Sequence, residues 1–199
     1  LYSCLIAMLK RSHITILLLF FLVTARTTSA REKRVGLFNS PKGFGLSMQL
    51  DSKAGDEISS FNLYGDTYGL LSGRTSDIGL AFSYSHNYIL RVFDFKYCRS
   101  SLYAGAGVLC SYVHDHEEGI FSNPEESQLA KEMGFVLALN CNAGYGIDFD
   151  RGISVDLSFS LSPGVFIHKK DDSSEILACL YKRGIFEVLI PQLCIFYRF

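Results

Sequence analysis

The sequence predicts an all-β chain folded as an eight-stranded antiparallel up-and-down transmembrane β-barrel. Apolar and polar residues alternate through much of the chain after residue 40, and this period of two is that of a strand with two different faces. The composition is 48% hydrophobic with 17 glycines, yet the only long apolar run lies near the N-terminus. Apolar residues spread in alternation through many short strands are typical of a barrel that faces lipid.

The N-terminal segment predicts an export signal. Lys10 and Arg11 precede a ten-residue apolar core at 14–23, and small residues at 28–30 follow it. The core is too short for a membrane-spanning helix, which needs about 20 apolar residues. We therefore expect a signal peptide at 1–30, with its start at Met8, and a barrel at 31–199.

The strongest strand prediction is a hairpin in the second half of the chain. In 153–162 the odd positions are Ile, Val, Leu, Phe and Leu, and the even positions are Ser or Asp. The segment 132–149 alternates in the same way, with Val136 as an apolar exception on its polar face. It is long enough to cross a membrane and project beyond it. Asp150, Arg151 and Gly152 predict a tight turn between the two.

Eight strands are expected, and their ends place the links. The predicted ranges are 43–51, 57–70, 76–86, 88–97, 100–113, 132–149, 152–168 and 184–199, with Pro191 at a locally unpaired position of the last. The long links 114–131 and 169–183 then lie opposite the termini, as outer loops do in such barrels. A second interpretation merges 76–97 into one strand and adds 174–181, and it moves the 114–131 link to the other side.

The end of the chain carries a motif in which Leu193, Ile195, Tyr197 and Phe199 alternate with other residues. Together with the alternation and the signal peptide, this motif resembles the small eight-stranded outer-membrane proteins of the OmpA-barrel and OmpX type. The tracts 44–46 and 102–107 are similar to uncharacterised Bacteroidetes-type barrels. The resemblance covers about 35–199. It implies the outer membrane of a Gram-negative bacterium and recognition of the last strand by the barrel-assembly machinery.

One cluster of possible metal ligands occurs, His114 with His116 and Glu117. Imidazole and carboxylate groups can bind divalent metals. Consecutive side chains on an extended loop diverge, however, and no further ligand is evident. We expect a solvated acidic loop, and no metal or other cofactor.

A second group could suggest an enzyme that modifies lipid or lipopolysaccharide. A serine nucleophile needs a base within hydrogen-bond reach and a third group that orients the base. Ser83 or Ser85 with His86 would need a partner on a neighbouring strand, such as Asp94. Because Ser85 and His86 are adjacent on a strand, they face opposite sides. We therefore expect no catalytic residues.

Four charged residues could face the lumen: Arg91, Asp148, Asp156 and Arg198, with Lys96 as a further partner. They could gate a narrow pore. The simpler interpretation is structural, because an eight-stranded barrel fills its interior with side chains and buried charges need partners.

The sequence therefore predicts an outer-membrane barrel with a structural or surface-interaction role. Expected partners are outer-membrane lipid, the assembly machinery, and an extracellular protein or matrix ligand at loops 114–131 and 169–183. A formal net charge of −1 argues against nucleic acid. The alternatives are the lipid-modifying enzyme, the narrow pore, and a soluble periplasmic β-barrel, which would turn its apolar face inward.

Overall fold

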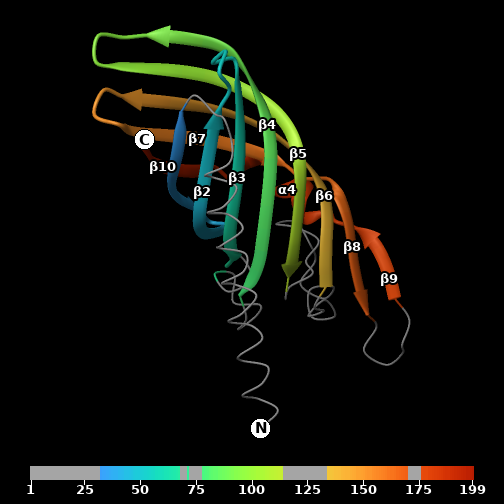
Figure 1. The fold of residues 1–199 in the computed structure, drawn as a ribbon. Coiled ribbons are helices and arrows are strands. Elements are labelled where there is room, and N and C mark those ends of the chain that lie inside the picture. The colour runs from blue at the N-terminus through green and yellow to red at the C-terminus, as the bar shows by residue number, and fades with distance from the viewer. Residues whose placement is uncertain (1–31, 68–70, 72–77, 114–133, 170–175) are drawn as a thin grey trace.

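The computed structural model describes residues 32–67, 71, 78–113, 134–169 and 176–199, which form a closed eight-stranded antiparallel barrel (Figure 1). The strands are β1 (Lys33–Ser40), β2 (Gly43–Asp51), β3 (Glu57–Asp66), β4 (Gly79–Asp94), β5 (Cys98–Val113), β6 (Gly134–Phe149), β7 (Ile153–Leu161), β8 (Gly164–Lys169), β9 (Ile176–Leu180) and β10 (Gln192–Arg198).

Ten strands make eight positions in the wall because two positions are interrupted. Both β7 and β8 pair with β6, so together they form one position that is broken at Ser162 and Pro163. The other contains β9, paired with β8, and β10, paired with β7. Between β9 and β10 lie α4 (Arg183–Phe186) and a 3₁₀ turn, η1 (Glu187–Leu189). The pairings β1–β10 and β5–β6 close the ring.

The two ends of the barrel differ. The first and last strands meet at one end, where the amides and carbonyls of Lys33 and Phe199 exchange hydrogen bonds. The connections 52–56, 95–97 and 150–152 lie at this termini end, the last containing Gly152 at φ 78°. The opposite end holds the register pair Val113 and Gly134. The predicted link 114–131 lies outside the described residues, but the strands before and after it meet at the expected end.

The strand count was predicted, but several element assignments were wrong. The predicted link 169–183 contains β9, which only the second interpretation expected, and the predicted strand 152–168 is broken at Ser162 and Pro163. The predicted ranges 76–86 and 88–97 correspond to one strand, β4, whose pairing with β5 shifts register between Ile89 and Arg91. This bulge interrupts the alternation that the prediction relied on. Strand β1 was missed, because Leu37 and Phe38 are adjacent apolar residues in it. The predicted strand 184–199 is a strand only at 192–198, and helical turns and Pro191 precede it.

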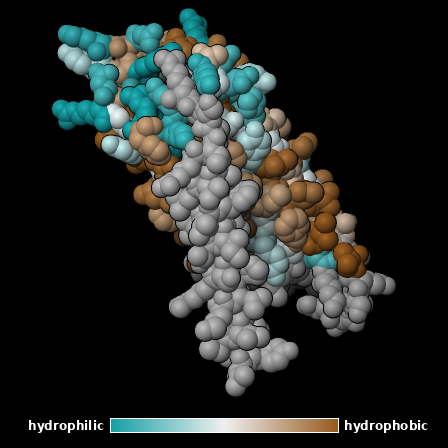
Figure 2. Space-filling view, viewed as in Figure 1, coloured by the Kyte–Doolittle hydropathy of each residue, from teal (hydrophilic) through white to brown (hydrophobic). Residues whose placement is uncertain are grey.

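The barrel wall has its apolar face outside. Large hydrophobic side chains on β1, β5, β6, β7 and β10 are exposed, including Leu139 at 61% and Ile195 at 52%. The alternating positions carry buried polar residues, among them Ser47, Ser83, Ser85, Asn87, Ser111, Ser154, Ser158 and Ser160. Figure 2 shows hydrophobic residues along the wall and hydrophilic ones gathered at its upper left. The sorting of faces is the inverse of that in a soluble barrel.

Within the part of the chain that the structure describes, no helix is long and apolar enough to cross a membrane.

Candidate functional site

The lumen contains an aromatic cluster. Phe38 on β1 packs with Cys194 and Phe196 on β10, and all three are buried. Tyr64 on β3 stacks on Phe38 with ring centroids 4.5 Å apart. These positions point inward because they alternate with Leu37, Leu193 and Ile195 on the outer face.

A second apolar cluster fills the lumen at the end opposite the termini. Its buried members come from four strands and from the segment before α4: Ala81, Leu109, Val113, Val136, Ala138, Phe166 and Tyr181. Val136, the apolar exception on the polar face of its strand, packs in this cluster. Phe166 lies over Gly134, where an added Cβ would come within 2.4 Å of the ring. The lumen is therefore a packed interior at this end.

Also inside the lumen, the Tyr103 side chain of β5 reaches over the neighbouring strand β6 to β7. The Tyr103 hydroxyl donates a hydrogen bond to Asp156 Oδ1 at 2.8 Å. Tyr103 lies opposite Gly144 in the pairing of β5 with β6, and a Cβ on Gly144 would lie 2.3 Å from its hydroxyl oxygen. The missing side chain at Gly144 thus makes room for the tyrosine, and the buried carboxyl group gains a donor.

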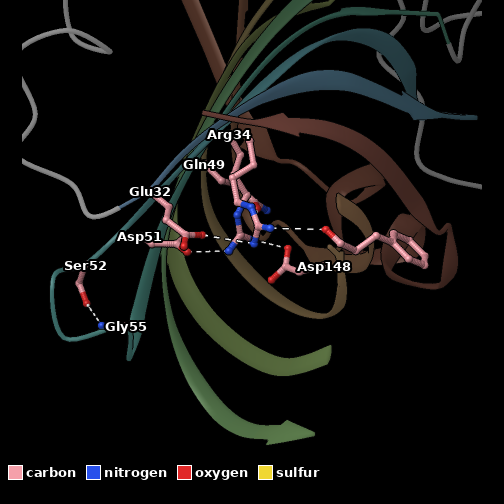
Figure 3. A network of polar contacts seen from close by, with 9 residues as sticks. Glu32, Arg34, Gln49, Asp51, Ser52, Gly55 and Asp148 are labelled. Carbon is pink, nitrogen blue, oxygen red and sulfur yellow. Dashed lines mark hydrogen bonds and ion pairs between the residues drawn. The ribbon is translucent and has the colours of Figure 1, made fainter. Parts of the chain in front are cut away.

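A charged network occupies the lumen at the termini end (Figure 3). The Arg34 guanidinium lies 2.6 Å from Asp51 Oδ2 and 3.4 Å from Asp148 Oδ1, and it donates a longer bond to Gln49. All three charged side chains are largely buried. A buried arginine placed between two carboxylates offsets part of their negative charge. A small cavity of about 60 Å³ borders the network.

At the other end, polar side chains hold the α4 segment against the barrel interior. Arg183 at the start of α4 pairs with Asp66 on β3 at 2.7 Å, and both side chains are nearly inaccessible. Lys42, in the β1–β2 turn, donates to Ser160 Oγ at 3.2 Å, and Gln192 donates to the same oxygen. The cavity among these residues is about 20 Å³, which admits about one water molecule.

Three of the predicted lumen charges point inward, and one does not. Asp148 belongs to the Arg34 network, and Asp156 is the acceptor of Tyr103. Arg198 borders the same cavity and pairs with Glu32 at 3.6 Å. Arg91 is exposed on the outer face opposite Leu102, so its prediction as a lumen charge was wrong. The bulge beside it reverses the inward and outward positions, and its guanidinium lies over the Phe93 ring. Lys96 is also exposed, over Tyr97.

The predicted serine and histidine candidates separate as their adjacency requires. Ser83 and Ser85 are buried in the lumen, and His86 lies on the outer face of β4. Asp94 pairs with Arg99 in the β4–β5 hairpin, away from His86.

His86 instead contacts a different serine, Ser59, and a different acidic residue, Glu57. Its Nδ1 atom is 3.3 Å from Ser59 Oγ, and its Nε2 atom is 3.6 Å from Glu57 Oε2. Ser59 lies directly opposite His86 in the β3–β4 pairing, and Glu57 lies two residues earlier on the same face of β3. A Ser–His–Glu group therefore forms on the outer wall. Sequence reasoning missed it because it depends on the register between two strands.

The remaining predicted residues lie elsewhere. Leu193, Ile195, Tyr197 and Phe199 are all exposed on the outer face of the last strand. His114, His116 and Glu117 lie outside the described residues. Among the described residues, no group of three or more side chains could hold a metal ion.

Four buried residues of the barrel interior were absent from the sequence prediction: Arg34, Tyr103, Asp66 and Arg183. Arg34 could have been found only by recognising β1. Tyr103 carries a signal, because it alternates with small residues in a Gly/Ala-rich strand. The pairing of Asp66 with Arg183 spans 117 residues, and no local pattern reveals it.

Comparison with family models, with curated proteins and with solved structures gives no significant match.

Proposed function

We propose that the chain is an integral outer-membrane β-barrel with a plugged lumen and a structural or surface-interaction role in the cell envelope. The outward apolar wall is the observation that carries this proposal. Monomeric soluble proteins rarely expose contiguous apolar patches larger than a few hundred Å². This barrel exposes large hydrophobic side chains on most of its strands, and the inward positions of the same strands carry many buried serines. A soluble periplasmic barrel would need the opposite arrangement.

The dimensions of the apolar wall also support this location. The outward positions of β6 run from Phe135 to Phe149, and the part from Phe135 to Tyr145 alone covers the roughly 9–11 residues of a tilted crossing. Exposed tyrosines lie near both limits of the wall, with Tyr112 near the far end and Tyr88 and Tyr197 near the termini end. Aromatic girdles at both interfaces are expected of outer-membrane barrels. The predicted export signal at 1–30 provides the route.

A role that needs no open channel fits the interior best. The aromatic cluster of Phe38, Tyr64 and Phe196 lies inside the lumen, and the α4 segment lies against one end. Ion flow would require displacing these side chains. Contacts with an extracellular protein or matrix would then fall to the predicted link 114–131 and to the connection between β8 and β9, because β9 and Arg183 take up much of the predicted link 169–183. Assembly machinery that recognises the last strand would bind the side chains of Leu193, Ile195, Tyr197 and Phe199.

Cell fractionation followed by detergent extraction tests the location. We expect the protein in the outer-membrane fraction, with different gel mobility in boiled and unboiled samples, because a closed barrel resists unfolding by detergent at room temperature. Release as a soluble periplasmic protein would overturn the proposal.

Planar-bilayer recording tests the plugged lumen. We expect no stable single-channel currents from the folded barrel. Steady ohmic steps would favour the narrow-pore alternative.

A further inference from the structure

The outer wall carries the one place in the described residues where the parts of a hydrolytic site meet. Ser59, His86 and Glu57 form a continuous chain of contacts, 3.3 Å from serine oxygen to imidazole and 3.6 Å from imidazole to carboxylate. Each imidazole nitrogen faces a different partner. With its proton on Nε2, the ring presents a lone pair to the Ser59 hydroxyl and an N–H toward Glu57. This order of nucleophile, base and orienting acid activates serine for acyl transfer.

The register of the β3–β4 pairing holds the three residues in place. Positions directly opposite on one face of an antiparallel pair have Cβ atoms about 4.5–5.5 Å apart, and diagonal positions remain within reach of long side chains. Ser59 and His86 are directly opposite, and Glu57 is diagonal to His86. Cross-strand aromatic residues flank the group: Phe61 and Tyr84 have ring centroids 5.0 Å apart on one side. On the other side, the Tyr88 ring contacts His86 edge-on at 5.2 Å.

The position of the group indicates the chemical class of a substrate. Glu57 is the first residue of β3, so the three side chains lie within about 7 Å of the termini end of that strand. The polar 52–56 turn follows them on the β3 side, and Phe61 and Tyr84 of the apolar wall lie next to them on the other side. An ester placed here would have its acyl chain along the apolar wall and its polar alcohol portion near the turn. About one-third of the His86 and Glu57 side chains is exposed, so a substrate has access.

We propose that Ser59, His86 and Glu57 hydrolyse acyl esters of lipids that lie against the outer wall. Ser59 Oγ bonds to the ester carbonyl carbon and passes its proton to His86 Nδ1. The bond from this carbon to the alcohol oxygen breaks, and the leaving alkoxide takes that proton from His86. Water then attacks the acyl-Ser59 ester, with His86 again accepting and returning a proton, and a fatty acid leaves. Glu57 stabilises the imidazolium at Nε2. The chemistry does not depend on the proposed membrane location, which only supplies the lipid.

The test uses the full-length protein folded in detergent micelles. Nitrophenyl esters of short and long fatty acids give the first readout. Phospholipid vesicles and lipopolysaccharide then distinguish the two lipid sources. We expect ester hydrolysis that Ser59→Ala and His86→Asn reduce by roughly a hundredfold or more, and Glu57→Gln by a smaller factor. Ser85→Ala is the matched control: it removes the lumen-facing hydroxyl beside His86, and the rate should not change.

A fluorophosphonate probe provides a readout that does not depend on comparing rates. It should add one adduct to the wild-type protein, at the peptide that contains Ser59, and none to folded Ser59→Ala. The boiled and unboiled gel shift confirms that each variant folds. Equal hydrolysis by wild type and folded Ser59→Ala, or no hydrolysis of any of these esters, would overturn the inference. Activity in a protein that fractionates as soluble would overturn the membrane proposal alone.

Discussion

Small residues inside the barrel are matched to particular large ones. The Tyr103 ring occupies the space over Gly144, and Phe166 occupies the space over Gly134. In a narrow barrel, inward side chains compete for one interior volume, so a large residue on one strand requires a small one opposite. The glycines of β6 are therefore part of the packing.

Gly144→Ala tests this matching. The new Cβ would lie 2.3 Å from the Tyr103 hydroxyl oxygen, so the ring must move and its bond to Asp156 weakens. We expect a loss of about 1–3 kcal/mol in the free energy of unfolding, as is usual for overpacking. Urea titration of the detergent-folded barrel, followed by gel mobility, measures it.

Gly146→Ala is the matched control for that substitution. It lies two residues further on the same face of β6, where a Cβ would approach Ser101 Oγ no closer than 3.3 Å. We expect a much smaller loss. Equal losses for the two variants would point to a general cost of replacing glycine in β6.

Single residues also show where sequence reasoning reached its limit. Asp148 and Asp156 were predicted to face the lumen because the alternation through β6 and β7 is uninterrupted. Arg91 was assigned to the wrong face because one extra residue in β4 reverses the alternation, and nothing in the sequence marks that bulge. Ser59 and Glu57 became neighbours of His86 only through the strand register.

Among the elements, the α4 segment is the part of the barrel that alternation could not predict. It interrupts the eighth wall position, and polar contacts secure it: Arg183 to Asp66, and the Gly184 carbonyl to the Ser162 amide. The segment is too short for its hydrophobic residues to show the repeat of a strand or of a helix. The uninterrupted strands β2 and β6, in contrast, follow closely from their alternating residues.

Asp66→Ala tests how far this segment stabilises the barrel. The substitution removes the closest carboxylate from a guanidinium with almost no access to water. We expect a loss of roughly 3–5 kcal/mol, typical of breaking one side of a buried ion pair. Adding Arg183→Met should recover much of it, because the uncompensated charge is then gone. Unfolding in urea measures both variants.

Asp94→Ala provides the exposed counterpart. Asp94 pairs with Arg99 at 3.5 Å, but both side chains are mostly in solvent. We expect a change below about 1 kcal/mol. A loss as large as that of Asp66→Ala would mean that the local position of the carboxylate, and not its burial, determines the effect.

For the whole molecule, the main question is whether lipid or water surrounds the apolar outer face of the barrel. In lipid, a charge on the outer face costs free energy according to its depth, and in water the same charge costs little. Leu139 lies near the middle of the apolar stretch of β6, between Phe135 and Tyr145, and it is well exposed. Ile153 is the first residue of β7, beside the tight turn at the termini end. These two aliphatic side chains therefore lie on the same outer surface at different depths along the barrel axis.

Leu139→Lys should therefore destabilise the barrel in lipid bilayers by about 2–4 kcal/mol, and Ile153→Lys by about 0–1 kcal/mol. Reversible unfolding in urea from phospholipid vesicles measures both. The difference should shrink in detergent micelles, which deform around a charge more easily than a bilayer does. If the two lysines cost the same in vesicles, the wall has no gradient of depth, and the apolar face would have to meet something other than a membrane. A large cost at Leu139 alone would show that the hydrocarbon layer lies where the alternation of apolar and polar residues indicates.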